Sequence, residues 1–177
     1  MNSKSVLLRL LIRAIRKERK SVSTKWNRVL SSGDYLNDRW EKAKYLGFGE
    51  GSSVYDSCIV LGEVKVGAQT WIGPFTILDG SGGLEIGDYC SISAGVQIYS
   101  HDTTRWATTF GVESAELSPT VIESGVYIGP NVVIQRGVVI GTGAVIGANS
   151  FVNRSIPPNS RAWGTPCRVH SNEQADL

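Results

Sequence analysis

The sequence predicts an all-β solenoid, in which the chain winds as a parallel β-helix, preceded by an N-terminal helical region. Three observations predict it: aliphatic residues recur at every sixth position in the second half of the chain, glycines follow several of them, and the same spacing extends back through the first half. A helix needs apolar spacings of three and four, and a strand alternates by two. A period of six therefore fits short strands separated by regular corners, with the aliphatic residues stacked in a central column.

The six-residue repeat covers about a hundred residues. It comprises Val54, Val60, Val66, Ile72, Leu78, then Ile86, Ile92, Ile98 after a two-residue slip in DGSGG (79–83), then Ile122, Ile128, Ile134, Ile140, Ile146 and Val152. Glycines directly follow the repeat at 67, 73, 129, 141 and 147, where we expect them to relieve corners that can need positive φ. No aliphatic residue fills a repeat position between Ile98 and Ile122, so 99–121 is predicted to be a loop that leaves the column.

Length and composition indicate one soluble domain. The chain has 177 residues, 41% of them hydrophobic, and its 20 glycines suit a fold with many corners. Cys58, Cys90 and Cys167 are odd in number and lack CxxC spacing, and no signal peptide is recognised, so we expect reduced thiols in a cytoplasmic protein. With only two histidines and no paired ligands, no metal site is expected.

We divide the chain into an N-terminal helical region (1–50), a β-helix (51–170) and a C-terminal tail (171–177). Residues 34–47 are expected to form a second short helix anchored by Leu36, Trp40 and Leu46. Neither helix is long enough to bury a core of its own.

The first thirty residues carry nine Lys or Arg and one acid, Glu18, which gives a net charge of +8 against −6 for the remainder. In residues 4–20, Leu8, Leu11, Ile12 and Ile15 share one helical side and Arg9, Arg13, Arg16 and Lys20 share another. Such a helix can cap the first coil of the solenoid or lie on an anionic membrane surface, at the inner face of the membrane. Its apolar length is too short to span a bilayer, and no nucleic-acid reader motif accompanies it.

Three stretches identify the family that the sequence resembles. IGDYCSISAGVQIYSHD (86–102), VYIGPNVVIQRGVVIGTGAVIGANSFV (126–152) and SIPPNSRAWGTPCRV (155–169) resemble the hexapeptide-repeat acyltransferases, and within them the galactoside and maltose O-acetyltransferases. The resemblance implies a left-handed parallel β-helix, a homotrimer with active sites between subunits, and acetyl-CoA as donor. It implies O-acetyl transfer to a sugar hydroxyl, and we expect an acceptor sugar of surface polysaccharide or lipopolysaccharide biosynthesis.

His101 is the candidate general base. Acyl transfer to an alcohol needs its proton removed, and an imidazole with a pKa of about 6.5 suits that task near neutral pH. The residue lies three positions beyond the last repeat position before the predicted loop. Asp102, Glu113 or Glu116 is expected to orient the ring, although Asp102 is adjacent and points away on an extended backbone.

The acceptor side is predicted from the resemblance and from the loop. Asp79 matches an acid that contacts the acceptor sugar, and Tyr127 matches an aromatic residue beside the thioester. Trp106, in the loop, is either a platform for a sugar ring or a contact with the adjacent subunit. Where galactoside and maltose enzymes have Asn-Phe-Asn, this chain has Gly73-Pro74-Phe75, so a different sugar is expected.

The donor site is expected along the later coils. By the same resemblance, the residues that contact coenzyme A are Gly129, Pro130, Ala148, Asn153, Arg154 and Arg168. A second cation, usual three residues after Arg168, is replaced by Ser171.

Two alternatives to O-acetyl transfer stay open: acylation of a nucleotide-linked amino sugar, and a solenoid without catalytic activity. A γ-type carbonic anhydrase is excluded, because it needs three zinc-ligating histidines and the chain has two.

Overall fold

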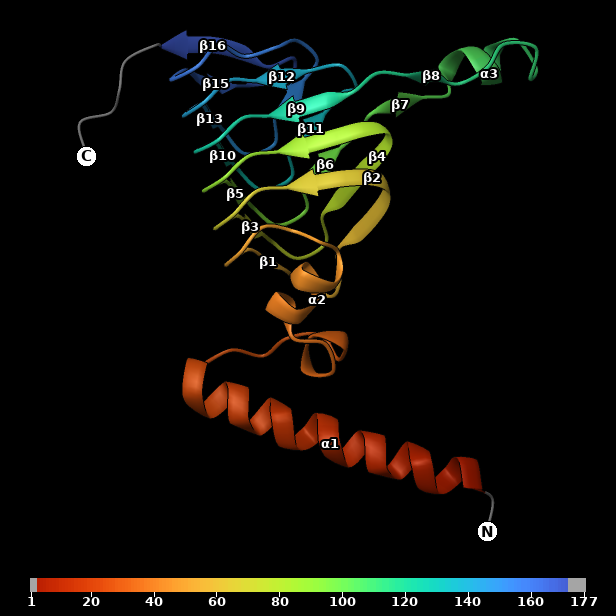
Figure 1. Cartoon of the computed structure of the whole chain (residues 1–177), viewed down its shortest axis with the longest axis vertical. Coiled ribbons are helices and arrows are strands. Elements are labelled where there is room, and N and C mark those ends of the chain that lie inside the picture. The colour runs from red at the N-terminus through yellow and green to blue at the C-terminus, as the bar shows by residue number, and fades with distance from the viewer. Residues whose placement is uncertain (1–2, 172–177) are drawn as a thin grey trace.

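The computed structural model describes residues 3–171 and shows a column of stacked coils with helices at its N-terminal end (Figure 1). Each coil has three short strands, and the strands of successive coils pair in parallel along three faces. The first face contains β1 (Ser53–Val54), β3 (Trp71–Ile72), β5 (Ser91–Ile92), β10 (Tyr127–Ile128), β13 (Val145–Ile146) and β15 (Arg161–Trp163). The predicted solenoid is confirmed.

The second and third faces share two long strands that bend from one face to the next. The second face contains the first halves of β2 (Ile59–Val66) and β4 (Ile77–Ile86), with β6 (Gln97–Ile98), β11 (Val133–Ile134) and β14 (Phe151–Val152). The third face contains the second halves of β2 and β4, with β9 (Thr120–Ile122) and β12 (Val139–Ile140).

The pairing register along the first face gives the number of residues in each coil. Tyr127 pairs with Val145, which is 18 residues further on and gives the regular coil. Trp71 pairs with Ser91, 20 residues on, because the DGSGG slip adds two residues to that coil. Ser91 pairs with Tyr127, 36 residues on, so the segment 99–121 is an excursion inserted into one coil without disturbing the stack.

The aliphatic repeat forms the core of the column. Every repeat position is buried except Val60, which is partly buried and packs against the core. Leu84, six residues after Leu78, is also buried, two positions before the repeat residue Ile86 on the same side of β4. Burying one such side chain contributes about 2 kcal/mol, so the column itself stabilises the fold.

The glycines that follow the repeat are needed for close approach between coils, and our expectation about φ is wrong for them. A Cβ on Gly129 would lie 2.7 Å from the amide nitrogen of Ala148, and a Cβ on Gly141 would lie 2.4 Å from that of Pro158. Positive φ occurs instead in the middle of the corners, for example at Gly143 (φ 70°) and Asn149 (φ 56°).

Of the helices at the N-terminal end, α2 (Arg39–Tyr45) is the one that covers the first coil. The others are α1 (Ser3–Trp26) and the 3-10 turn η1 (Gly33–Tyr35). Helix α2 covers the first coil: Ala43 is buried there, and Lys42 Nζ donates to the carbonyl oxygens of Tyr55 (3.0 Å), Asp56 (2.9 Å) and Cys58 (3.1 Å). These carbonyls lie at the open end of the solenoid, which the cap therefore satisfies.

Two expectations for this region are corrected. The helix predicted over 34–47 starts only at Arg39, after Asp38 caps it by accepting from the amides of Trp40 (2.9 Å) and Glu41 (3.1 Å). With that later start, Leu36 and Trp40 are half exposed, whereas Leu46 packs against the core as expected, together with the buried Ala43 and Phe48. The first coil is covered by α2, and α1 lies beyond it.

At the other end, β16 (Arg168–Ser171) folds back antiparallel onto β15 and ends the parallel stack. Of the predicted tail 171–177, Ser171 belongs to this strand, and the remainder lies outside the described residues. Within the described chain, no helix is both long and apolar enough to cross a membrane.

Candidate active site

Two edges of the column carry the predicted site residues. We define the first edge as the corners where the chain passes from the first to the second face, and the second edge as those where it passes from the second to the third face. The second edge carries the DGSGG slip and the excursion 99–121. His101 lies at the base of this excursion.

The excursion is a hairpin with a helical tip. β7 (His101–Asp102) pairs antiparallel with β8 (Glu116–Leu117), and α3 (Thr104–Thr108) lies between them. The Ser118 amide then donates to the Ser100 carbonyl (2.9 Å), which returns the chain to the column. The hairpin thus fixes the backbone on both sides of His101.

Asp79 is the partner of His101. Its Oδ2 is in hydrogen-bond contact with His101 Nδ1, and the Asp79 side chain is fully buried whereas 32% of the His101 side chain is exposed. The same carboxylate accepts from the Ser81 amide (3.0 Å), the Ser81 hydroxyl (2.5 Å) and the Ser100 amide (3.1 Å). Our expectation that Asp79 faces the acceptor sugar is therefore not met in the chain, since donors within the protein surround this carboxylate.

The surroundings of Asp79 keep it ionised. Burial alone would raise its pKa, but hydrogen bonds from Ser81, from His101 and from the Ser100 amide outweigh that effect and lower the pKa to about 2. An ionised Asp79 fixes the proton of His101 on Nδ1, so Nε2 is left as a proton acceptor. Because the ring is partly exposed, that nitrogen is available to a substrate.

The sequence builds this pair with small residues. A Cβ on Gly80 would lie 2.1 Å from the carbonyl oxygen of Glu63, and a Cβ on Gly82 would lie 2.3 Å from that of Ser100. The Gly82 amide also donates to the buried hydroxyl of Ser100 (2.8 Å). Only glycines at these two positions let the DGSGG turn pass close enough to bring Asp79 under His101.

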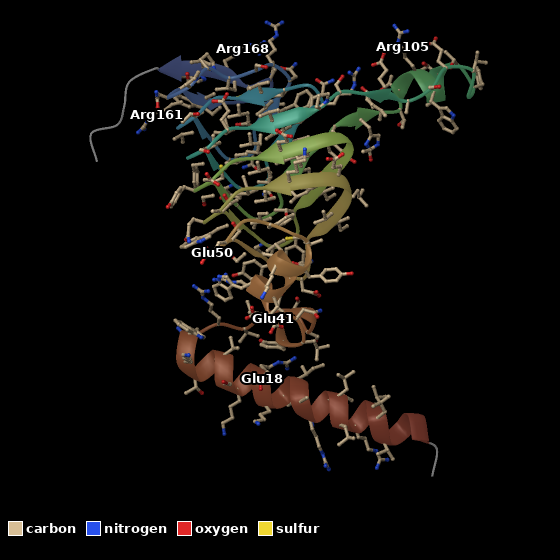
Figure 2. All side chains as sticks on the ribbon, viewed as in Figure 1. Glu18, Glu41, Glu50, Arg105, Arg161 and Arg168 are labelled. Carbon is tan, nitrogen blue, oxygen red and sulfur yellow. The ribbon has the colours of Figure 1, made fainter. Side chains whose placement is uncertain are left out.

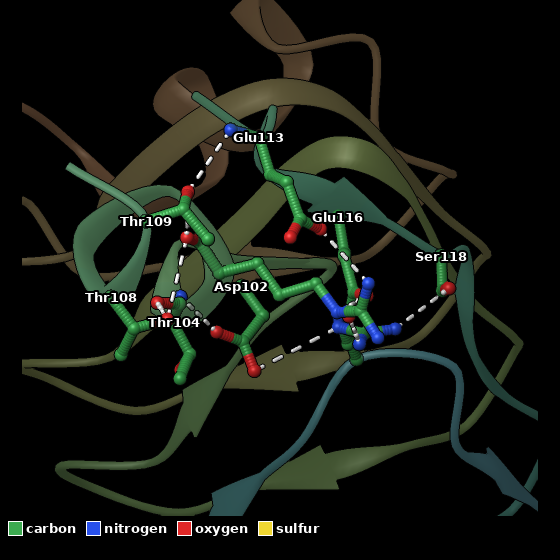
Figure 3. A network of polar contacts seen from close by, with 9 residues as sticks. Asp102, Thr104, Thr108, Thr109, Glu113, Glu116 and Ser118 are labelled. Atoms are coloured by element: carbon green, nitrogen blue, oxygen red, sulfur yellow. Dashed lines mark hydrogen bonds and ion pairs between the residues drawn. The ribbon is translucent and has the colours of Figure 1, made fainter. Parts of the chain in front are cut away.

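The three carboxylates predicted to orient His101 instead hold the excursion in place (Figure 3). Arg105 pairs with Glu113 (2.9 Å) and Glu116 (3.1 Å). Arg136, from the next coil of the column, pairs closely with Glu116 and lies 3.9 Å from Asp102. In the described chain none of these acids is hydrogen-bonded to His101, so the expected role is corrected: Asp79 makes that contact.

Arg136 completes the anchor. Its Nη1 donates to the Ser118 hydroxyl (3.2 Å), and its Nε is buried with no hydrogen-bond partner within the described chain. Asp102 points away from His101, as expected for adjacent residues of a strand, and accepts from the Thr104 amide (2.7 Å). Like Asp79, Asp102 has a lowered pKa, here caused chiefly by its hydrogen bonds with Thr104.

Trp106 and Tyr127 are exposed on different parts of the molecule. Trp106 lies on α3 and is 54% exposed, and Phe110 beside it is almost fully exposed. Tyr127 is 43% exposed on the outer side of the first face. The structure therefore does not bring either residue into contact with His101 within one chain.

The predicted donor residues divide between the two edges. Gly129, Pro130 and Ala148 follow strands of the first face and lie on the first edge, whereas Asn153 and Arg154 follow β14 and lie on the second edge with His101. Arg168 is exposed at the C-terminal end of the column, with Arg161 at the same end (Figure 2). Within one chain, the second face of the column therefore lies between these two groups of residues.

A cavity elsewhere in the molecule holds none of the predicted site residues. It lies between the end of α1 and α2 and is lined by Trp26, Arg39, Trp40 and Tyr55 among others. Among the described residues, no group of three or more His, Cys, Asp or Glu side chains is placed to hold a metal ion.

The coil length is the signal that could have identified the missed residues. Arg136 lies 18 residues beyond Ser118, one regular coil, and therefore directly above it. The coil that starts near Asp79 is lengthened by the two-residue slip, which places Asp79 beneath residues 99–101. Counting the residues in each coil would have placed Asp79 next to His101. Matching to family motifs does not, because it considers each residue separately.

Comparisons with known proteins agree with this architecture. Residues 119–154 match the family described as bacterial transferase hexapeptide (six repeats). Galactoside O-acetyltransferase of Escherichia coli (strain K12) is 55% identical over 51 residues, which are 29% of this chain and 25% of the relative. The match thus spans a quarter of that relative's length.

Two solved structures are similar to most of this chain. A hexapeptide-repeat-containing acetyltransferase from Vibrio cholerae O1 biovar eltor, complexed with acetyl coenzyme A, is 30% identical with a TM-score of 0.67, covering 89% of this chain and 86% of that one. An N-acyltransferase from Bacillus cereus, in complex with dTDP and 3-hydroxybutyryl-CoA, is 27% identical with a TM-score of 0.64 and covers 70% of each chain. With this repeat, this column and these relatives, the chain belongs to the hexapeptide-repeat acyltransferases.

Proposed function

We propose that the protein transfers an acetyl group from acetyl-CoA to a sugar hydroxyl, with His101 as general base. The observation that carries the proposal is the pair at the base of the excursion: a buried, ionised Asp79 in contact with Nδ1 of a partly exposed imidazole. A structural histidine would gain nothing from a free Nε2 that faces solvent.

In the proposed reaction, His101 Nε2 takes the proton of the acceptor hydroxyl as the oxygen attacks the thioester carbonyl. Asp79 stabilises the imidazolium that forms, and a backbone N–H near Gly129 is proposed to stabilise the oxyanion, a contribution of about 3 kcal/mol. The tetrahedral intermediate then expels the thiolate of coenzyme A, which receives the proton from the imidazolium. The products are the acetyl ester and free coenzyme A.

The donor and the assembly are part of the same proposal. Gly129, Pro130, Ala148, Asn153, Arg154 and Arg168 would contact coenzyme A, with Trp106 and Tyr127 beside the reacting groups. Because these residues lie on two edges, a homotrimer would form each groove between the first edge of one copy and the second edge of the next.

The acceptor is proposed to be a sugar of surface polysaccharide or lipopolysaccharide biosynthesis. Gly73-Pro74-Phe75 stands where relatives that acetylate simple galactosides carry Asn-Phe-Asn, and Phe75 is exposed there with φ 60°. A cytoplasmic location is proposed, because Cys58, Cys90 and Cys167 are all free, and burial raises the pKa of each thiol.

Acyl transfer to the amine of a nucleotide-linked sugar is the second candidate. The similarity to the Bacillus cereus N-acyltransferase, which was solved with dTDP, favours it. An amine also needs to lose a proton during acyl transfer, so the same imidazole would serve.

Acceptor profiling with radiolabelled acetyl-CoA tests both. We expect labelled product with acceptors that offer a sugar hydroxyl. Hydroxylamine, which cleaves esters and leaves amides intact, should release the labelled acetyl group from this product. His101→Ala should lower kcat by about 10²-fold or more with little change in KM for acetyl-CoA. Full turnover by this variant would show the base assignment to be wrong, and hydroxylamine-stable product would favour the amine.

A further inference from the structure

Helix α1 has an apolar surface that nothing in the described chain covers. Six large apolar residues within seven positions are between 38% and 70% exposed: Val6, Leu7, Leu8, Leu10, Leu11 and Ile12. In the described chain, the helix contacts the rest of the protein toward its C-terminal end, where Arg19 lies 5.8 Å from the Tyr35 ring and Val22 and Trp26 line the cavity beside α2. The N-terminal half of the helix projects from the molecule (Figure 1), and its apolar side chains are exposed.

The N-terminal half is two-sided. With 100° per residue, Leu7, Leu8, Leu11 and Ile15 lie on one side of the helix, and Arg9, Arg13 and Arg16 lie on the opposite side. Val6, Leu10 and Ile12 flank the arginines and widen the apolar surface. Glu18 interrupts the apolar side one turn later, so the two-sided segment is residues 6–16.

Within the described chain, no acidic side chain forms an ion pair with the basic residues of this helix. Arg9, Arg13, Arg16, Lys17, Arg19, Lys20 and Lys25 are all exposed. Among the described side chains, every ion pair involves other residues of the column and the excursion. The positive field of α1 is therefore available to an anionic partner.

We propose that residues 6–16 of α1 lie in the surface of an anionic phospholipid bilayer, with the leucines at the headgroup boundary and the arginines on lipid phosphates. A surface with a negative charge above an apolar interior matches both sides of the helix, whereas nucleic acid or an acidic protein would match the charge alone. Helix α1 lies crosswise at the end of the column opposite the excursion (Figure 1), so it can lie flat while the column stands clear of the membrane. This inference is independent of the proposed acetyl transfer.

Co-sedimentation with vesicles tests the proposal on the full chain. We expect the protein to bind phosphatidylcholine vesicles that contain phosphatidylglycerol at least about 10-fold more strongly than vesicles of phosphatidylcholine alone. Raising the salt from about 0.05 M to about 0.5 M should weaken the binding, because it screens exposed charges. Equal binding to both kinds of vesicle, or none, would overturn the proposal.

Two variants of α1 separate its two sides. Leu7→Asp combined with Leu11→Asp, and Arg9→Glu combined with Arg13→Glu, should each reduce binding to the level seen without phosphatidylglycerol. Val112→Asp, on the exposed excursion, and Lys65→Glu, on the third face, are the matched controls and should bind as the unchanged protein does. Thermal unfolding of each variant checks that the column remains folded.

The alternative occupant of the apolar side is α1 of a second copy. Analytical ultracentrifugation distinguishes it: the Leu7 and Leu11 substitutions should leave the oligomeric state unchanged if the helix binds lipid. The proposal would be wrong if the unchanged protein did not bind anionic vesicles and the Leu7 and Leu11 substitutions reduced the oligomeric state. That result would show that α1 of another copy covers the helix.

Discussion

The contact between Asp79 and His101 explains how one buried acid can set the chemistry of an exposed ring. Asp79 receives four hydrogen bonds, so its charge is stabilised without any contribution from solvent. His101 could be identified from the sequence because it lies in a recognisable motif. Its partner could not be identified by motif, since it lies 22 residues earlier and meets the ring only through the winding of the coil.

Asp79→Asn is expected to lower kcat by about 10²-fold or more, with KM for acetyl-CoA nearly unchanged. A neutral amide can donate to Nδ1, which moves the ring proton to Nε2 and removes the base. It also no longer stabilises the imidazolium that forms during transfer. Steady-state kinetics of both proteins measure kcat and KM separately, and a loss confined to kcat is not what a purely structural role for Asp79 would produce.

The lowered pKa of Asp79 predicts how stability depends on pH. Its folded pKa is about 2 against an ordinary value of 3.8, so its contribution of about 2 kcal/mol is fully present above about pH 4. As the pH falls through the folded pKa, that contribution is lost. Urea unfolding between pH 5 and about pH 2 should show a steeper loss for the unchanged protein than for Asp79→Asn, and parallel curves would contradict the ionised, hydrogen-bonded state of Asp79.

At the scale of elements, the excursion is a rigid hairpin held to the column by charges. The sequence predicts its boundaries, because the aliphatic repeat stops at Ile98 and resumes at Ile122. Its internal structure was not predictable in the same way, since it depends on Arg136, which belongs to a different coil. The same holds for the glycines. Their spacing is visible in the sequence, but the reason for them is the close approach of neighbouring coils: a Cβ on Gly129 would lie 2.7 Å from the amide nitrogen of Ala148.

Arg136→Ala is expected to loosen the excursion. The substitution leaves Glu116 without its closest cation, removes the hydrogen bond to Ser118, and leaves Asp102 with less positive charge nearby. We expect faster cleavage within 103–115 by limited proteolysis and a fall in kcat of about 10-fold, because the backbone on both sides of His101 becomes less fixed.

Lys65→Ala provides the control for Arg136→Ala. Lys65 also lies near two carboxylates, Glu63 (3.4 Å) and Glu85 (3.1 Å), but it is exposed on the third face away from the excursion. Because exposed pairs contribute roughly 0 to 1 kcal/mol, this substitution should change neither proteolysis nor turnover. Equal effects of the two substitutions would mean that Arg136 has no particular role in holding the excursion.

At the scale of the whole molecule, the column keeps its two closed ends apart from the edges that carry the predicted site residues. The helical cap closes one end, β16 closes the other, and the predicted site residues lie on two different edges between them. The period of six predicts the column itself, because each coil repeats the same physical requirement. It does not predict how copies assemble, since the outward-facing residues follow no such rule.

A mixed trimer provides the sharpest test of a site shared between copies. His101→Ala removes the base from the second edge, and Ala148→Trp would fill the groove at the first edge, so each variant alone should lose about 10²-fold or more in activity. If each site takes His101 from one copy and the first edge from the next, any trimer that contains both variants has one intact site out of three. Trimers purified through two different tags, one on each variant, should therefore recover about a third of the original activity. If each site lay within a single chain, every site would carry one of the two defects and no activity would return.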